Sequence, residues 1–146
     1  MSDGRRGPDG AHLEALARHP VVVMATVQPD GRPHLSLVRP WVHDGVAEVT
    51  LTDQRVKTRN LRANPRAAFL AVGDGWERFV VADGRAELSP VSTEPGDATG
   101  QRLADLYRAV AGEHPEWDDY HRAMVADRRL VASITLDHTY AGGTHT

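Results

Sequence analysis

Short apolar segments separated by tight turns recur along this chain, and they constrain its fold more than any other feature. Turn signals stand at residues 29–33, at Asp44-Gly45 and at Asp74-Gly75, where glycine accepts a positive φ and proline presets a negative one. Between the turns the residues are apolar or alternate in polarity, as strands do. The pattern predicts six strands, at residues 21–27, 34–41, 46–52, 67–72, 76–88 and 130–140.

Connections between these strands indicate a small barrel. Two short turns join the first three strands, which predicts a three-stranded antiparallel meander, and the fifth strand is expected to bend or bulge at Asp83-Gly84. Short helices are expected around the strands, beginning after Asp9, in the segment before Asn64-Pro65, and near residues 103–110 and 117–125. The class is therefore mainly β (α+β), with six antiparallel strands and peripheral helices. Because a chain of 146 residues cannot enclose a roomy interior, a ligand would sit outside the barrel or between subunits.

Composition narrows the function classes. The formal net charge of −3 argues against a general nucleic-acid binder, and the absence of cysteine excludes disulfides and thiolate metal sites. Eight histidines lack the spacing of a zinc-binding helix, so we assign no metal ligand. No apolar run reaches the roughly 18 residues of a membrane span. We expect a cytoplasmic protein with a flexible lead at 1–10, a barrel domain at 11–141 and a tail at 142–146.

A basic segment follows the third predicted strand and opens a short helix. It carries Arg55, Lys57, Arg59, Arg62 and Arg66, with no acid after Asp53. Such a cluster at a strand-to-helix junction suits a phosphate or carboxylate ligand, and Thr58 and Asn60 could add neutral hydrogen bonds. A solvated charged face is the alternative, although the acids that usually alternate with basic residues on such a face are missing.

The familiar catalytic motifs are absent. The sequence has no nucleophile elbow, phosphate-binding loop or dinucleotide fingerprint, so no catalytic residue is assigned. If the protein is an enzyme, an organic cofactor would supply the chemistry. Trp41 and Trp76 have two interpretations, as ordinary packing aromatics or as walls for a planar ring.

Five segments together resemble a known superfamily. They are residues 24–36, 55–61, 64–66, 74–76 and 112–120. The chain resembles the split β-barrel flavin and deazaflavin oxidoreductases of the pyridoxamine 5′-phosphate oxidase superfamily. Apart from the first segment, which is common to the whole superfamily, they are similar to the actinobacterial group B, which binds the deazaflavin coenzyme F-420.

This resemblance implies a homodimer of split barrels with two coenzyme sites at the interface. The implied activity is hydride transfer from the reduced coenzyme to an unsaturated small-molecule acceptor. Arg55 and Lys57 would hold the coenzyme phosphate, Trp76 would approach from the partner subunit, and Arg128, with Arg129 beside it, would meet the acidic tail. The full set of implied coenzyme-binding residues is Ser36, Leu37, Val38, Thr50, Arg55, Val56, Lys57, Thr58, Asn60, Trp76 and Arg128.

Three alternatives stay open. An FMN enzyme of the same fold would use the same basic segment, because both coenzymes carry a ring and a phosphate. A protein that binds F-420 without turning it over would look the same in sequence. A haem or tetrapyrrole protein on this barrel is the third, although none of the eight histidines is singled out as an axial ligand.

Overall fold

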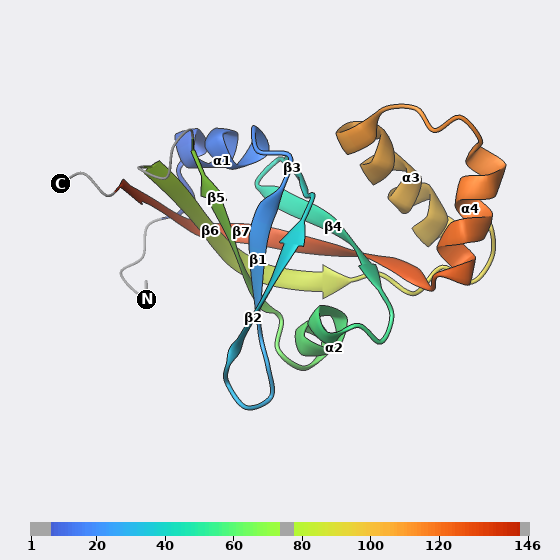
Figure 1. Ribbon diagram of the computed structural model, residues 1–146, viewed down its shortest axis with the longest axis horizontal. Coiled ribbons are helices and arrows are strands. Elements are labelled where there is room, and N and C mark those ends of the chain that lie inside the picture. Colours follow the sequence, from blue (N-terminus) through green and yellow to red (C-terminus); the bar gives the residue numbers. More distant parts are fainter. Residues whose placement is uncertain (1–6, 74–77, 144–146) are drawn as a thin grey trace.

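Within residues 7–73 and 78–143, which the computed structural model describes, seven strands form one antiparallel sheet in the order β2-β1-β5-β6-β7-β4-β3. The sheet curls into a half-barrel, with helices at its ends and beneath it (Figure 1). This agrees with the predicted mainly β architecture. In chain order the elements are α1 (Gly10–Ala17), β1 (Val22–Val27), β2 (Pro33–Val38), β3 (Trp41–His43), β4 (Val46–Thr52), α2 (Val56–Ala63), β5 (Arg66–Val72), β6 (Arg78–Leu88), α3 (Ala98–Ala111), α4 (Trp117–Ala126) and β7 (Arg129–Gly143).

The strand predicted at residues 34–41 is two strands, and this accounts for seven strands instead of six. β2 ends at Val38 and β3 begins at Trp41, with Arg39 and Pro40 between them. Proline has no backbone N–H to give to a ladder, so a continuous strand is interrupted there. Pro40 is buried in the corner that results.

The predicted meander is also wrong, because the chain crosses from one edge of the sheet to the other at this corner. β2 pairs only with β1, whereas β4 pairs with β3 and with the final strand β7. β3 pairs with residues 46–48 of β4, and no described strand pairs with residues 49–52 on that side. The opening between this part of β4 and the edge strand β2 is the split of the barrel.

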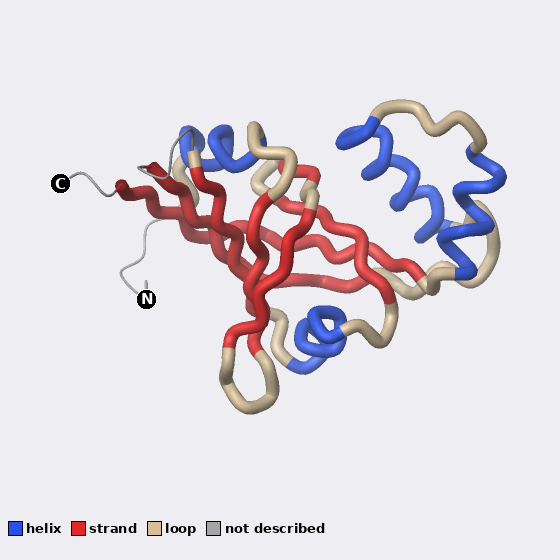
Figure 2. Tube along the Cα trace, in the orientation of Figure 1, coloured by secondary structure: helices blue, strands red, loops and turns tan. Residues whose placement is uncertain are grey.

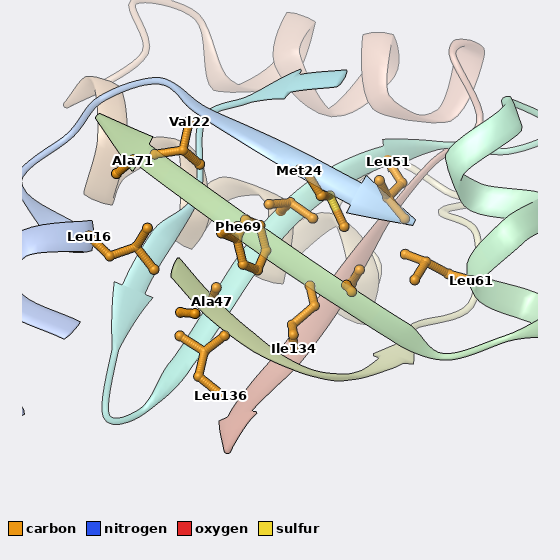
Figure 3. Packing of buried hydrophobic residues seen from close by; sticks show 14 of the residues in the cluster. Leu16, Val22, Met24, Ala47, Leu51, Leu61, Phe69, Ala71, Ile134 and Leu136 are labelled. Atoms are coloured by element: carbon orange, nitrogen blue, oxygen red, sulfur yellow. The ribbon is translucent and has the colours of Figure 1, made fainter. Parts of the chain in front are cut away.

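The interior of the half-barrel is filled by the main hydrophobic core. Buried positions alternate along β1, β4 and β5, as expected for strands with one face inward. Met24, Leu51, Phe69 and Ile134 are at most 1% exposed; Phe69 lies in the middle of the cluster, Leu51 toward α2 and Leu16 of α1 at the opposite end (Figure 3). Within the described ranges, the interior of the half-barrel is therefore packed with side chains.

Helices α3 and α4 form a hairpin at the far end of the sheet (Figure 2). A second, smaller core lies beneath it, where Leu103, Leu106 and Tyr120 pack against Val131 of β7. Asp97 caps the N-terminus of α3. Burial opposes ionisation of its carboxyl group, but the group accepts hydrogen bonds from Gly100, Thr93, Ser92 and Glu94. These hydrogen bonds lower the pKa of Asp97 to about 2. None of the described helices is long and apolar enough to cross a membrane.

The expected bulge in the fifth predicted strand is confirmed. The pairing of β6 with β7 shifts register between Asp83 and Gly84. A Cβ atom on Gly84 would lie 1.8 Å from the carbonyl oxygen of Thr135 on β7, so only glycine fits this close approach of two backbones.

We therefore expect Gly84→Ala to lower the free energy of unfolding by at least about 2 kcal/mol, because neither backbone can move without breaking the ladder. Gly10→Ala is the matched control: a Cβ there meets nothing within 4 Å, and alanine favours the helix. Chemical denaturation of both variants measures the difference. Equal stability of the two variants would contradict the close approach.

Candidate functional site

Helix α2 lies across one end of the split and is tied to β4 on one side and to β1, the neighbour of β2, on the other. The Thr58 hydroxyl donates to the carbonyl oxygen of Thr52 on β4 at 2.7 Å, and the Asn60 side-chain amide donates to the Thr26 hydroxyl on β1 at 3.1 Å. Thr58 and Asn60 are 0% and 4% exposed. These are the two side chains that the sequence suggested as hydrogen-bond donors to a ligand. In the structure, both hold α2 in position.

The first turn of α2 faces the split without a cap of its own. Arg55 occupies the N-cap position, its side chain makes no capping hydrogen bond, and the first turn holds no acidic residue. The uncapped N–H groups and the helix dipole make this end attractive to an anion. Basic side chains therefore gather where the backbone already carries partial positive charge.

Two adjoining cavities follow the split, and together they are called the split groove here. The first, of about 340 Å³, is lined by His34, Thr50, Thr52, Arg55, Val56, Lys57 and Arg129. The second, of about 380 Å³, is lined by Leu37, Val38, Arg39, Val49, Thr50, Lys57, Leu106, Tyr107, Val110, Ala111, Tyr120 and Arg129. They share Thr50, Lys57 and Arg129, so the groove is continuous from α2 to the α3–α4 hairpin.

Three cationic side chains, Arg55, Lys57 and Arg129, line the α2 end of the groove. Burial, together with repulsion from Arg55 and Arg129, lowers the pKa of the Lys57 ammonium. Among the described residues that line either cavity, none is acidic. The nearest carboxylate that the structure records lies outside the lining: Asp127, whose Oδ2 is 3.8 Å from the Arg129 Nε. An anion that entered would stabilise these cations, since an opposite charge nearby offsets both burial and mutual repulsion.

Asp53 forms ion pairs with two arginines that lie outside the groove, Arg62 and Arg128. It accepts hydrogen bonds from Arg128 at 2.8 and 3.1 Å and from Arg62 at 2.6 Å. These two contacts, with Arg128 the stronger influence, lower the pKa of the Asp53 carboxyl. Arg128 lines neither cavity of the groove; its neighbour Arg129 lines both. Of the two adjacent arginines that the sequence analysis named together, only Arg129 lines the groove.

Strand β2 contributes polar atoms that lack partners. The Ser36 Oγ and His34 Nδ1 atoms are buried and have no hydrogen-bond partner within the described parts of the chain. Ser36 pairs in register with Met24 and His34 with Thr26, both inward residues of β1, so both side chains point to the inner side of the sheet. The sequence analysis did not name His34 as a candidate binding residue. The alternation along β2, which places His34 on the same face as Ser36, could have indicated it.

The far end of the groove is mostly apolar, with Arg39 at its margin, where the guanidinium donates to the Val110 carbonyl oxygen. Val38 and Val49 form one wall, and Leu106, Tyr107 and Val110 of α3 form the other. The Tyr120 hydroxyl donates to the Leu103 carbonyl oxygen at 2.9 Å, and burial raises the pKa of Tyr120 to about 12. Tyr120 is therefore a neutral packing residue of this wall at ordinary pH. The two ends together suit an amphipathic ligand with an anionic group and a flat apolar part.

Of the remaining predicted residues, Leu37, Val38, Thr50 and Val56 line the groove, as do Arg55 and Lys57. Trp76 lies outside the described residues.

A larger cavity of about 540 Å³ lies elsewhere, on the outer side of β1, β5 and β6. Its lining mixes Arg66 and Arg85 with Asp83 and Asp137. We prefer the groove because its charge has one sign and its polar atoms lack partners.

Comparison with known proteins agrees with this architecture. Residues 8–140 match the family described as pyridoxamine 5′-phosphate oxidase. The chain belongs to this family. A conserved hypothetical protein from Mycobacterium tuberculosis has the same fold, with a TM-score of 0.71 and 23% identity over 99% of this chain and 91% of that one. The split-barrel fold that the sequence suggested is thus confirmed.

Two further solved structures are similar to this chain, and their names describe different coenzymes. An F-420 reductase is 27% identical, with a TM-score of 0.67 over 91% of this chain and 98% of that one. A FAD-binding protein from Mesorhizobium loti is 20% identical, with a TM-score of 0.64 over 93% of each chain. The same fold therefore occurs in proteins whose names describe different coenzymes.

Thr58→Val tests the anchoring of α2. Valine keeps the shape but removes the hydroxyl donor, so the Thr52 carbonyl oxygen keeps only the longer bond from the Arg55 N–H at 3.3 Å. We expect a loss of about 1 kcal/mol in the free energy of unfolding. Thr135→Val, at an exposed position of β7, should change stability by less than about 0.5 kcal/mol. Denaturant titration compares them. A Thr58→Val protein as stable as the control would mean that the Thr58 hydrogen bond does not contribute to holding α2.

Proposed function

We propose that this protein is a coenzyme F-420-dependent reductase that transfers a hydride from the reduced deazaflavin to an unsaturated small-molecule acceptor. The crowding of Lys57 with Arg55 and Arg129, in a groove lined by no acid within the described chain, carries this proposal. Membership of the family and the likeness to an F-420 reductase support it. The coenzyme's phosphate and acidic tail provide the negative charge that this end of the groove lacks.

The described residues fit such a ligand from end to end. Arg55, Lys57 and the N-terminus of α2 would hold the phosphate, and Arg129 would meet the phosphate or the acidic tail. Thr50 would offer its hydroxyl group to the ring beside Val38, and Ser36, which lines neither cavity, keeps a buried and unpaired hydroxyl on the neighbouring strand. The bound coenzyme supplies the hydride chemistry, while the protein binds it, orients it and keeps water out of the apolar end.

FMN is the alternative coenzyme, and the likeness to a FAD-binding protein favours keeping it. Its phosphate would occupy the same cations, so charge does not separate the two. A protein that binds F-420 without turnover is the second alternative, because a binding groove requires no catalytic side chain. Direct binding and turnover measurements distinguish all three.

We further propose that two copies of the chain associate through the outer face of the sheet. One apolar row crosses five strands in register, from Leu37 to Val23, Leu70, Val81 and Tyr140. None of the five belongs to either described hydrophobic core, and Leu37 is 71% exposed. Leu37 also lines the groove, so a partner on this face would lie beside the ligand. Exposed apolar rows of this kind mark association surfaces.

The coenzyme assignment is tested by parallel titrations of the purified protein with F-420 and FMN, followed by fluorescence polarisation. We expect tighter binding of F-420, weakened about tenfold or more by Arg55→Ala and by Lys57→Ala, since each removes a charge-assisted contact. Arg59→Ala is the matched control. It removes a charge from the same helix at an exposed position that does not line the groove.

Each outcome has a distinct meaning. Preference for FMN would identify a flavin enzyme, and equal losses in all three variants would show general charge attraction without a phosphate site. Tight F-420 binding without reduction of any acceptor in a broad panel would indicate a binding protein. A Soret band in the purified protein would point to haem.

Leu35→Glu tests association. Leu35 is 62% exposed on the outer face beside the apolar row and does not line the groove, so the change spares the folded subunit. We expect light scattering to show a dimer for the wild type and a monomer for Leu35→Glu, because a buried unpaired carboxylate is costly. Ala123→Glu, exposed on α4, should remain dimeric. A monomeric wild type would refute the proposal.

A further inference from the structure

His34 is the one imidazole among the described residues that line the split groove. It stands on the edge strand β2, in register with Thr26 of β1, and its side chain is half-buried. Its Nδ1 atom is buried without a hydrogen-bond partner in the described chain. Because most buried polar atoms in folded proteins are paired, an unpaired imidazole nitrogen at a cavity wall indicates a missing partner, such as a ligand.

The groups around His34 determine what that ligand would be. Helix α2 contributes Arg55 and Lys57 to the same cavity, and β7 contributes Arg129. Strand β4 contributes the neutral Thr50 and Thr52. On β1, the Thr26 hydroxyl already accepts from Asn60, and Ser36 on β2 itself is uncharged.

No carboxylate among the described lining residues can therefore pair with a protonated His34. A proton on the imidazole would meet three cations in the empty cavity and an anion when the cavity is filled. The charge state of His34 is consequently coupled to occupation of the groove by an anionic group.

We propose that His34 is a proton-linked contact for the anionic group of the coenzyme: the imidazole takes up a proton from solvent as the ligand binds, and affinity declines as the pH rises through the titration range of histidine. The identity of the ligand rests on the proposed function, but the same coupling applies to the phosphate of F-420 or of FMN. His34 thus makes coenzyme affinity sensitive to pH, whereas Arg55 and Arg129 contribute a constant attraction.

The sign of the effect follows from linkage. A ligand that binds the protonated protein more tightly gains affinity below the pH where the free histidine titrates and loses it above the pH where the bound histidine titrates. A difference of one pKa unit between free and bound protein corresponds to tenfold in affinity. We expect the wild type to bind about 5- to 10-fold more weakly at pH 8 than at pH 6 because of His34.

The experiment measures F-420 and FMN affinity from pH 5.5 to 8.5 for the wild type and for His34→Gln, which keeps hydrogen-bonding atoms but cannot become charged. Titration of the coenzyme itself is common to both proteins, so the difference between their profiles reports on His34. Calorimetry in two buffers of different ionisation enthalpy counts the protons taken up. The wild type should take up a fraction of a proton at pH 7 that His34→Gln does not.

His43→Gln is the matched control. His43 is also a half-buried histidine on a short strand, but it lies 2.6 Å from Glu48 and does not line the groove. Its variant should keep the wild-type pH profile and the wild-type proton uptake. Thermal unfolding of each variant verifies that the subunit is folded.

The outcomes separate this inference from the proposed function. Parallel pH profiles and equal proton uptake in wild type and His34→Gln, with coenzyme still bound, would overturn the role of His34 and leave the coenzyme assignment intact. If neither coenzyme binds at any pH, the proposed function fails, and inorganic phosphate becomes the probe, with the His34 ring followed by NMR. A titration midpoint that rises with phosphate would support the inference for another phosphate ligand; an unmoved midpoint would overturn it.

Discussion

Two buried side-chain hydrogen bonds hold helix α2 across the split, and the rest of the site depends on them. Thr58 ties the helix to β4, and Asn60 ties it to β1. Each such bond contributes only about 0.5–1.5 kcal/mol net, but breaking one leaves a buried polar group unpaired at a greater cost. The helix therefore has one favoured position, and that position sets Arg55 and Lys57 at the end of the groove. Polar residues that looked like ligand donors act instead on the geometry of the cations.

Asp53 divides the basic residues into two sets. It binds Arg62 and Arg128, and these arginines lie outside the groove. Arg55, Lys57 and Arg129 line it, where burial and mutual repulsion lower the pKa of Lys57. This division explains how a chain with a net charge of −3 presents a local concentration of positive charge. The carboxylates of Asp53 and Asp127 lie beside the groove, and none of its described lining residues is acidic.

The split also connects the ligand groove with the outer face of the sheet. β2 is an edge strand whose alternate residues point to opposite sides: His34 and Ser36 inward, Leu35 and Leu37 outward. A strand of this kind can contribute polar atoms to a ligand and apolar side chains to a partner subunit at the same time. In the proposed dimer, binding and association would therefore share one strand. This gives a physical reason for coenzyme sites at a subunit interface in a barrel whose interior is already filled.

The sequence by itself determined the local elements and the chemistry that they carry. Turn residues, alternation and helix-ending prolines predicted the strand at Val46–Thr52, the helix ending at Ala63 and the bulge at Asp83-Gly84, because these features depend on neighbouring residues. Only the tertiary structure decided that β4 leaves β2 and pairs with β7, which opens the groove. It also decided that Arg129, and not Arg128, lines that groove, since the choice depends on an ion pair with Asp53, 75 residues away in the chain. Adjacent arginines look alike in a sequence; long-range pairing and strand direction give them different surroundings.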